Sequence, residues 1–277
     1  MRALVWNCRG AGSPLTIPQL KEMIKFHSPL LVFLSETKKK SYMNSVKQWV
    51  KFDHLFVVDP VGIAGGLAVF WKKEIQVKTI LFTSFTIELL IAGYEGQRDW
   101  WCICTYASTD DRVREQQWNV IERRKSIWGN CWAIMGDLND IKSNGEKWGG
   151  RVRPESSFVT FNNFINSNEL LDIGFEGVPW TWCNNWGKEG EVKERIDRIL
   201  GTKQWCANFE WAKCSHIETE ASDHCALILD TTPARRIRKR RFRFDRRWLL
   251  QEDIGAVIKD AWKTSQQGSR YIRWRIK

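Results

Sequence analysis

Short apolar runs alternate with amphipathic segments along about 230 residues of the chain. The apolar runs are bounded by glycine, proline or charged residues and predict buried strands at 3–6, 30–34, 66–71, 86–92, 101–106, 131–135 and 226–229. Apolar residues recur at helical spacing in 17–26, 115–128 and 156–169, where Phe158, Phe161, Phe164 and Ile165 form one stripe. Strands that alternate with helices predict an α/β fold in which helices cover the strands.

A change of composition at Thr231-Thr232-Pro233 ends this alternating pattern. Before it, glycine-rich turns are expected at 62–66, 145–150 and 184–190. After it come an arginine-rich run and a short amphipathic stretch at 248–262. The pattern therefore predicts one domain at 1–232 and a basic, linker-like extension at 233–277, whose abrupt end is consistent with a fragment.

Composition narrows the class of protein. With 43% hydrophobic and 27% charged residues, the chain is globular, and disorder as a whole-chain property is excluded. No stretch reaches the roughly 20 apolar residues of a membrane span, and the N-terminus turns polar too soon for a secretory signal. Eight cysteines lack zinc-ligand spacing, and Cys102 and Cys104 share one face of an expected strand. We therefore expect reduced thiols in a nuclear or cytoplasmic protein.

The net charge of +11 lies in the extension. Residues 233–277 hold 15 basic and four acidic side chains, whereas residues 1–232 hold 28 of each sign. A neutral body with a basic tail predicts a polyanion partner, although a solubilising or nuclear-targeting run explains the charge equally well. The candidate nucleic-acid contacts in the tail are Arg235, Arg236, Arg238, Lys239, Arg240 and Arg241.

Polar residues gather at the ends of the apolar runs, where α/β folds place their chemistry. They are Asn7, Glu36, Tyr106, Asp137, Asn139, Asp197, Asp223 and His224. Taken singly, a strand-end aspartate more often caps a helix or turn, and a lone histidine is more often a satisfied core residue. Taken together, they are suited to metal-assisted hydrolysis of a phosphoester.

The proposed chemistry follows from the donor types. Mg²⁺ prefers oxygen ligands, and four carboxylates with two amides supply them. A histidine that titrates near neutrality activates or holds the attacking water when a carboxylate fixes its ring. The metal and the amides then stabilise the charge that develops on the phosphate oxygens.

Five short motifs occur in an order that resembles the endonuclease/exonuclease/phosphatase superfamily. They are Trp-Asn-Cys-Arg-Gly (6–10), Ser-Glu-Thr (35–37), Gly-Asp-Leu-Asn (136–139), Arg-Ile-Asp-Arg (195–198) and Ser-Asp-His-Cys (222–225). More closely, the chain resembles the apurinic-endonuclease-like nuclease domain of plant non-LTR retrotransposons, the long interspersed elements. Connecting segments at 65–72, 145–150 and 179–184 agree with that resemblance, which covers about residues 1–232.

The resemblance implies a four-layer sandwich of two mixed β-sheets flanked by helices, as in deoxyribonuclease I, with the active site at one sheet edge. It implies that Glu36 binds the metal beside Asn7, that Asp223 lies near the metal, and that Tyr106 contacts the phosphate. His224 corresponds to the catalytic histidine and Asp197 to its orienting partner. Asp137 and Asn139 correspond to the pair that orients water and phosphate.

The same resemblance implies a Mg²⁺-dependent endonuclease, with Mn²⁺ as a possible substitute, that nicks DNA. In the intact element a reverse transcriptase domain follows downstream, and the 277 residues do not include one. No membrane and no obligate protein partner is expected.

One position departs from the family pattern. Many members carry an acid or amide two residues after the first asparagine, and here that residue is Arg9. The departure puts a second or tightly held metal in question. Arg9 is expected to contact the DNA backbone or a site carboxylate, or else to be a solvated arginine of the turn.

Three functions compete at this stage. A DNA-nicking endonuclease accounts for the motifs and the tail. A superfamily phosphatase acting on inositol lipids, or a sphingomyelinase, is disfavoured because such enzymes usually carry longer insertions than a 232-residue body allows. A catalytically inactive, nucleic-acid-binding remnant of a retroelement is the third, and a nicking assay separates it from the first.

Overall fold

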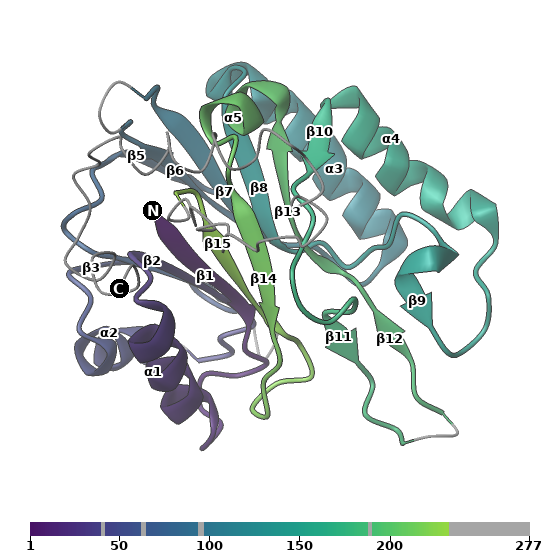
Figure 1. Ribbon diagram of the computed structural model, residues 1–277, viewed down its shortest axis with the longest axis horizontal. Helices are drawn as coiled ribbons and strands as arrows, with labels where there is room; N and C mark the ends of the chain where they lie inside the picture. Colours follow the sequence, from purple (N-terminus) through teal and green to yellow (C-terminus); the bar gives the residue numbers. More distant parts are fainter. Residues whose placement is uncertain (40–41, 62–64, 94–96, 188–189, 233–277) are drawn as a thin grey trace, which may run out of the picture. The chain divides into compact units, whose positions relative to one another are not determined.

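The computed structural model describes residues 1–39, 42–61, 65–93, 97–187 and 190–232. The predicted stretch 248–262 lies outside the described residues, as do the six candidate nucleic-acid contacts Arg235, Arg236, Arg238, Lys239, Arg240 and Arg241. In the described part, two six-stranded sheets face each other and helices cover their outer surfaces (Figure 1).

The first sheet has the strand order β14-β15-β1-β2-β4-β3. Its strands are β1 (Arg2–Asn7), β2 (Leu31–Ser35), β3 (His54–Val58), β4 (Leu67–Trp71), β14 (Lys213–Ile217) and β15 (Ala226–Asp230). Strands β1 and β2 are parallel, with Asn7 opposite Ser35, so both end at one edge. Strand β15 is antiparallel to β1 and begins at that edge, which places His224 beside Asn7.

The second sheet has the strand order β10-β13-β8-β7-β6-β5. Its strands are β5 (Val77–Phe82), β6 (Thr86–Ile91), β7 (Trp100–Tyr106), β8 (Trp132–Asp137), β10 (Leu170–Asp172) and β13 (Asp197–Thr202). Strands β7 and β8 are parallel and place Tyr106 opposite Asp137. Strand β13 is antiparallel to β8 and places Asp197 opposite the same aspartate. The polar ends of three strands therefore meet.

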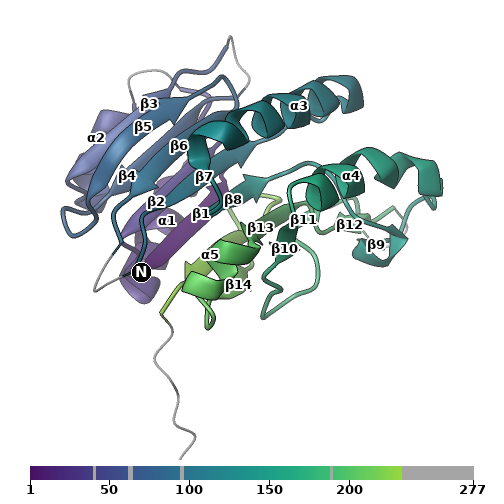
Figure 2. The same cartoon turned by 90° about the horizontal axis from the view of Figure 1, so that it is seen from above.

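Three apolar clusters hold four layers together (Figure 2). Alternate residues of the two sheets, among them Phe33 and Met135, fill the space between them. On the outer face of the first sheet, residues such as Val32 pack against α1 (Thr16–His27) and α2 (Met43–Val50). On that of the second sheet, residues such as Ile134 pack against α3 (Asp111–Trp128) and α4 (Val159–Ser167). The period-2 alternation of each strand supplies both faces, and the predicted four-layer α/β sandwich is confirmed.

Tryptophan fills much of this core. The side chains of Trp6, Trp132 and Trp205 are less than 2% exposed, and truncating one such side chain to alanine costs about 3–5 kcal/mol. By contrast, Trp186 is 80% exposed in the turn between two short strands. These strands, β11 (Trp182–Cys183) and β12 (Lys193–Glu194), form a third sheet with β9 (Lys147–Trp148).

The predicted strands and helices all occur, with ends that differ by at most four residues. The segment 156–169 divides into a 3₁₀ turn, η2 (Glu155–Phe158), followed by α4, and its aromatic stripe is buried as predicted. The turn predicted at 145–150 is wrong in part, because η1 (Asn144–Glu146) and β9 occupy its first half. There Lys147 and Trp148 pair with β12, and only Gly149 and Gly150 have the positive φ of a turn. The expected turn at 184–190 is confirmed where it is described.

Several elements had no clear signal in the sequence. Strands β3 and β5 lie at sheet edges, and neither contains a buried residue, although each carries a short apolar run. Strand β13 is fully buried but carries Asp197 and Arg198, and helix α5 (Lys203–Asn208) is short. All eight cysteines are free, and the Sγ atoms of Cys102 and Cys104 lie 3.8 Å apart on one face of β7, as expected. Among the described helices, none is both long and apolar enough to cross a bilayer.

Candidate active site

The loops that leave the strands turn the polar side chains toward one another. Arg9, Glu36 and Asn139, which follow β1, β2 and β8, have φ angles of 46°, 52° and 50°. Left-handed conformations are unfavourable for arginine and glutamate, although asparagine tolerates them, and strained residues of this kind cluster at functional sites. Gly136, just before Asp137, has a φ of 139°, and a Cβ there would lie 2.0 Å from the carbonyl oxygen of Thr105. Glycine is therefore required for β8 to approach β7 at this point.

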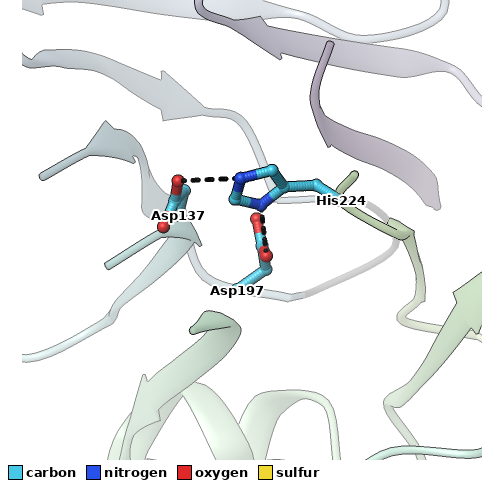
Figure 3. A group of neighbouring side chains, drawn as sticks. All are labelled: Asp137, Asp197 and His224. Carbon is cyan, nitrogen blue, oxygen red and sulfur yellow. Dashed lines mark hydrogen bonds and ion pairs between the residues drawn. The ribbon is translucent and has the colours of Figure 1, made fainter. Parts of the chain in front are cut away.

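A hydrogen-bonded His–Asp pair lies at the centre of the site (Figure 3). His224 donates from Nδ1 to Oδ2 of Asp197 at 2.9 Å, which leaves Nε2 facing Oδ2 of Asp137 at 3.8 Å. All three side chains are at most 5% exposed. The geometry fixes the ring of His224. Its other nitrogen, Nε2, lies 3.4 Å from Nδ2 of Asn7 and borders the pocket, where it can exchange a proton with a bound group.

Burial and charge shift the pKa values of this group. Burial lowers the pKa of His224, but the carboxylates of Asp197 and Asp137 outweigh it and raise the pKa to about 9. Burial, with the negative charge of Asp197, raises the pKa of Asp137 to about 7. Both shifts favour a proton shared within the cluster, so the imidazole of His224 is a stronger base than a free histidine.

Glu36 is held by donors from three directions. Its Oε1 accepts hydrogen bonds from Nδ2 of Asn7 at 3.0 Å and from the hydroxyl of Tyr106 at 3.1 Å. Its Oε2 forms an ion pair with Nζ of Lys38 at 2.7 Å. Burial raises the pKa of Glu36, but Lys38 and the two hydrogen bonds outweigh it and bring the pKa below its ordinary value. Burial and the nearby carboxylates raise the pKa of Tyr106, so its phenol stays protonated as a donor.

Asn7 joins the two sheets at the site. Its Nδ2 donates to Oδ2 of Asp137 at 2.9 Å as well as to Glu36, and its Oδ1 accepts from the backbone N–H of Arg9. The amide therefore orients two carboxylates from different sheets. Asn139 lies on the other side of Asp137: its backbone N–H donates to Oδ1 of that residue at 2.9 Å. Its Nδ2 donates to the carbonyl of Ala107 at 2.8 Å.

Asp223 is bound by two side chains. Arg9 forms an ion pair with its Oδ2 through Nη1, and Trp182 donates to the same oxygen from Nε1 at 2.9 Å. The other oxygen, Oδ1, is buried, lacks a hydrogen-bond partner among the described residues, and lies 4.0 Å from Nε2 of His224. An acceptor in this state accommodates a water molecule or a cation.

A second network supports Asp197 from behind. The fully buried guanidinium of Arg198 pairs with Glu146 and Asp172, and Arg195 pairs with the same two carboxylates. Burial raises the pKa of both acids, but the arginines bring each below its ordinary value. The backbone N–H groups of Ile196 and Asp197 donate to Oγ1 of Thr181. These contacts fix the start of β13, and with it Asp197.

The site fits a hard divalent cation. A pocket of about 310 Å³ is bounded by Arg9, Glu36, Asp137, Asn139, Asp223 and His224. Ligand atoms of Asp137, Asp197 and His224 lie within 4.8 Å of one another, but Nδ1 of His224 is already bound to Asp197. Glu36, Glu194 and Asp223 are carboxylates of the pocket wall that lie outside this group, and Glu194 is paired with Lys147. The unpartnered Oδ1 of Asp223 shows that the pocket can take a further polar group.

All nine site residues expected within 1–232 lie at this edge, Arg9 included. Three neighbours were missed: Lys38, Trp182 and Glu146. Each lies within or next to a quoted motif, Lys38 after Ser-Glu-Thr, Trp182 in Pro-Trp-Thr-Trp-Cys-Asn, and Glu146 in Gly-Glu-Lys-Trp-Gly-Gly. Their position within or beside these motifs was the signal in the sequence, but a single sequence does not show which residue each of them contacts.

Comparison with known proteins agrees with this geometry. A family model described as Endonuclease/Exonuclease/phosphatase family matches residues 4–224, so the chain belongs to that family. No curated protein matches.

Solved structures share the fold. The 3′ phosphatase NExo from Neisseria, bound to a product DNA hairpin, is 15% identical with a TM-score of 0.67, covering 83% of this chain and 98% of that one. An AP endonuclease from Archaeoglobus fulgidus is 15% identical with a TM-score of 0.64 and the same coverage. The AP endonuclease LMAP from Leishmania major is 13% identical with a TM-score of 0.60, covering 82% of this chain and 86% of that one.

Proposed function

We propose that this member of the Endonuclease/Exonuclease/phosphatase family is a divalent-metal-dependent phosphodiesterase that nicks DNA, of the type found in non-LTR retrotransposons. The observation that carries the proposal is the pair of His224 and Asp197. The second imidazole nitrogen of His224 faces Asp137 at a pocket that Glu36 also lines. A histidine fixed in this way is the arrangement that water-attack chemistry needs.

The residues take distinct roles in the proposed reaction. Asp197 holds the ring of His224 so that Nε2 accepts a proton from the attacking water, and Asp137 orients that water. Glu36, oriented by Asn7 and Tyr106, is the residue that would hold Mg²⁺ or Mn²⁺. When bound, the ion supplies positive charge against the negative charge that develops on the phosphate oxygens. The single hydroxyl proton of Tyr106 is donated to Glu36 in this structure, and when substrate is bound it would be donated to a phosphate oxygen instead.

DNA is the proposed substrate for two reasons. Structures that share this fold include AP endonucleases and a phosphatase bound to a DNA hairpin. The chain itself carries its entire net positive charge in residues 233–277, which suits a polyanion. The motifs at 6–10 and 145–150 support the retrotransposon type.

The test is a nicking assay on supercoiled plasmid with Mg²⁺, Mn²⁺ or EDTA. We expect open-circle product with either metal, none with EDTA, and a loss of at least ~10²-fold in His224→Ala, Asp137→Asn and Glu36→Gln. His216→Gln is the matched control, since His216 is equally buried but lies outside the site and binds the carbonyl of Val178. Site variants that nick at the wild-type rate would show that the assignment is wrong.

An inactive, nucleic-acid-binding remnant is the second candidate. It is favoured by one observation: cationic side chains already contact two of the site carboxylates, Lys38 on Glu36 and Arg9 on Asp223. DNA binding without any nicking in Mg²⁺ or Mn²⁺ would support it. Release of phosphate from 3′-phosphorylated oligonucleotides without plasmid nicking would instead indicate a phosphatase.

A further inference from the structure

Arg9 belongs to the site through its contacts and not only through its place in the sequence. Its backbone N–H donates to Oδ1 of Asn7, and its guanidinium pairs with Asp223 across 214 residues of chain. The Arg9 side chain is 52% exposed and borders the pocket. Within the described residues, Nη1 is the guanidinium nitrogen that carries a hydrogen bond, so Nε and Nη2 keep their donors available to a ligand.

The net charge of the site determines how many divalent cations are needed to neutralise it. Its carboxylates are Glu36, Asp137, Asp197 and Asp223, and its fixed cations are Arg9 and Lys38. With these acids ionised, the four carboxylates and two fixed cations sum to −2, and the proton that the metal-free site holds on His224 brings the sum to −1. A single divalent ion is therefore enough to balance the site. A second ion would leave an excess of positive charge and would have to displace Arg9 from Asp223, whose Oδ2 also accepts from Trp182.

We infer that Arg9 takes the place of a second cation in this site. Its guanidinium neutralises Asp223 and presents its remaining N–H donors to the scissile phosphate, while Glu36 holds the single divalent ion. The inference deepens the proposed nuclease function and rests on it for the identity of the phosphate. A guanidinium is suited to this task because its planar fork matches phosphate oxygens and it stays charged at all relevant pH values.

Counting bound Mn²⁺ by electron paramagnetic resonance tests, independently of activity, whether the site binds a single divalent ion. We expect one Mn²⁺ per wild-type chain. Asp223→Asn should keep that number with a dissociation constant within about twofold of wild type, and Glu36→Gln should weaken binding at least tenfold. Arg9→Asp should bind a second Mn²⁺, because it adds an oxygen ligand and frees Asp223. Thermal melting of each variant confirms that it folds.

The outcomes separate this inference from the proposed function. Two Mn²⁺ ions in the wild type, none, or an Asp223→Asn variant that binds Mn²⁺ tenfold more weakly would each overturn it. One bound ion without nicking would refute the nuclease and leave the single-ion site standing.

The phosphate contact has its own readout in plasmid nicking. Arg9→Ala should lower kcat/KM about 100-fold, mainly through kcat, and Arg9→Lys should recover part of that loss because it keeps the charge without the fork. An Arg9→Ala variant with wild-type kcat would overturn the inference that Arg9 contacts the scissile phosphate.

Discussion

Replacing Asp197 by asparagine tests the central pair of the site with almost no change in shape. The wild-type carboxylate accepts a 2.9 Å hydrogen bond from Nδ1 of His224, and the Asp197 side chain is only 3% exposed. Asparagine keeps the volume but removes the charge, and its amide can present a donor to the ring and favour the wrong tautomer. We expect the nicking rate to fall by about 10²–10⁴-fold, as for other histidine bases that lose their carboxylate.

In the metal-free protein, the effect of Asp197→Asn on folding stability can be worked out from the pKa of His224. That pKa is about 9 in the folded chain against an ordinary 6.5. A difference of this size corresponds to about 3 kcal/mol of extra stability for the protonated form, supplied against burial by Asp197 and Asp137 together. Because the folded pKa is raised, this contribution is fully present below pH 6.5 and is lost as the pH rises through 9. The Asp197→Asn variant should therefore be destabilised most below pH 6.5, with the difference shrinking toward pH 9.

Two measurements follow the variant. Single-turnover plasmid nicking with Mg²⁺ gives the rate, and an NMR titration of the imidazole protons without added metal gives the pKa. The chain has four histidines, so His224→Gln identifies the resonance. Asp230→Asn is the control, since Asp230 ends a strand in an exposed ion pair with Arg2 away from the pocket.

Two results would refute the reasoning. One is a nicking rate within threefold of wild type for Asp197→Asn when His224→Ala has lost activity. The other is a His224 resonance that titrates at the same pH in both proteins.

Three further predictions concern the surroundings of the pair. Tyr106→Phe removes only the hydroxyl that donates to Glu36, and we expect an about tenfold lower rate of plasmid nicking. Arg198→Met should lower the free energy of unfolding in urea by about 3 kcal/mol, because it leaves Glu146 and Asp172 with fewer partners in the interior. Since the pKa values of both acids are depressed, their contribution is present above the ordinary carboxyl range and lost as pH falls, so the loss in Arg198→Met should shrink in acid. A chain ending at residue 232 should still nick DNA at low salt. If half of the nine basic residues at 235–247 contact phosphates, the log of its DNA-binding constant should fall with log salt along a slope that is flatter by about four units. Equal slopes for the full chain and the shortened chain would contradict this.

The core of the fold could be predicted because its strands are buried on both faces. The runs 101–106 and 131–135 are apolar apart from Thr105, and these became the central strands β7 and β8. Edge strands β3 and β5 could not be predicted in this way, since none of their residues is fully buried. Strand β13 could not be predicted because it contains the charged residue Arg198. This charge is buried only because Glu146 and Asp172 approach it from distant parts of the chain.

The site could be predicted at the level of residue types and positions. Polar residues that follow apolar runs identified Asn7, Glu36 and Asp137, and parallel strands bring such ends together. His224 was identified because it precedes an apolar run, and the antiparallel pairing of β15 with β1 brings it to the same place. Which of them touch depends on how the two sheets face each other, and a single sequence contains no information on that. A contact of Arg9 with a site carboxylate was one of the alternatives expected from the sequence, but its partner, Asp223, and the pairing of Lys38 with Glu36 emerged only in three dimensions.

Several residues of the site depend on the side-chain amide of Asn7 because it lies where the two sheets meet. Asn7 ends a strand of the first sheet and donates both to Glu36, which follows the neighbouring strand, and to Asp137, which ends a strand of the second. Its own carbonyl oxygen accepts from the backbone N–H of Arg9. A shift of one sheet relative to the other would thus move the proposed metal carboxylate, the water-orienting carboxylate and the guanidinium at once. The apolar cluster between the sheets, by fixing that spacing, is as much a determinant of the site as the polar residues themselves.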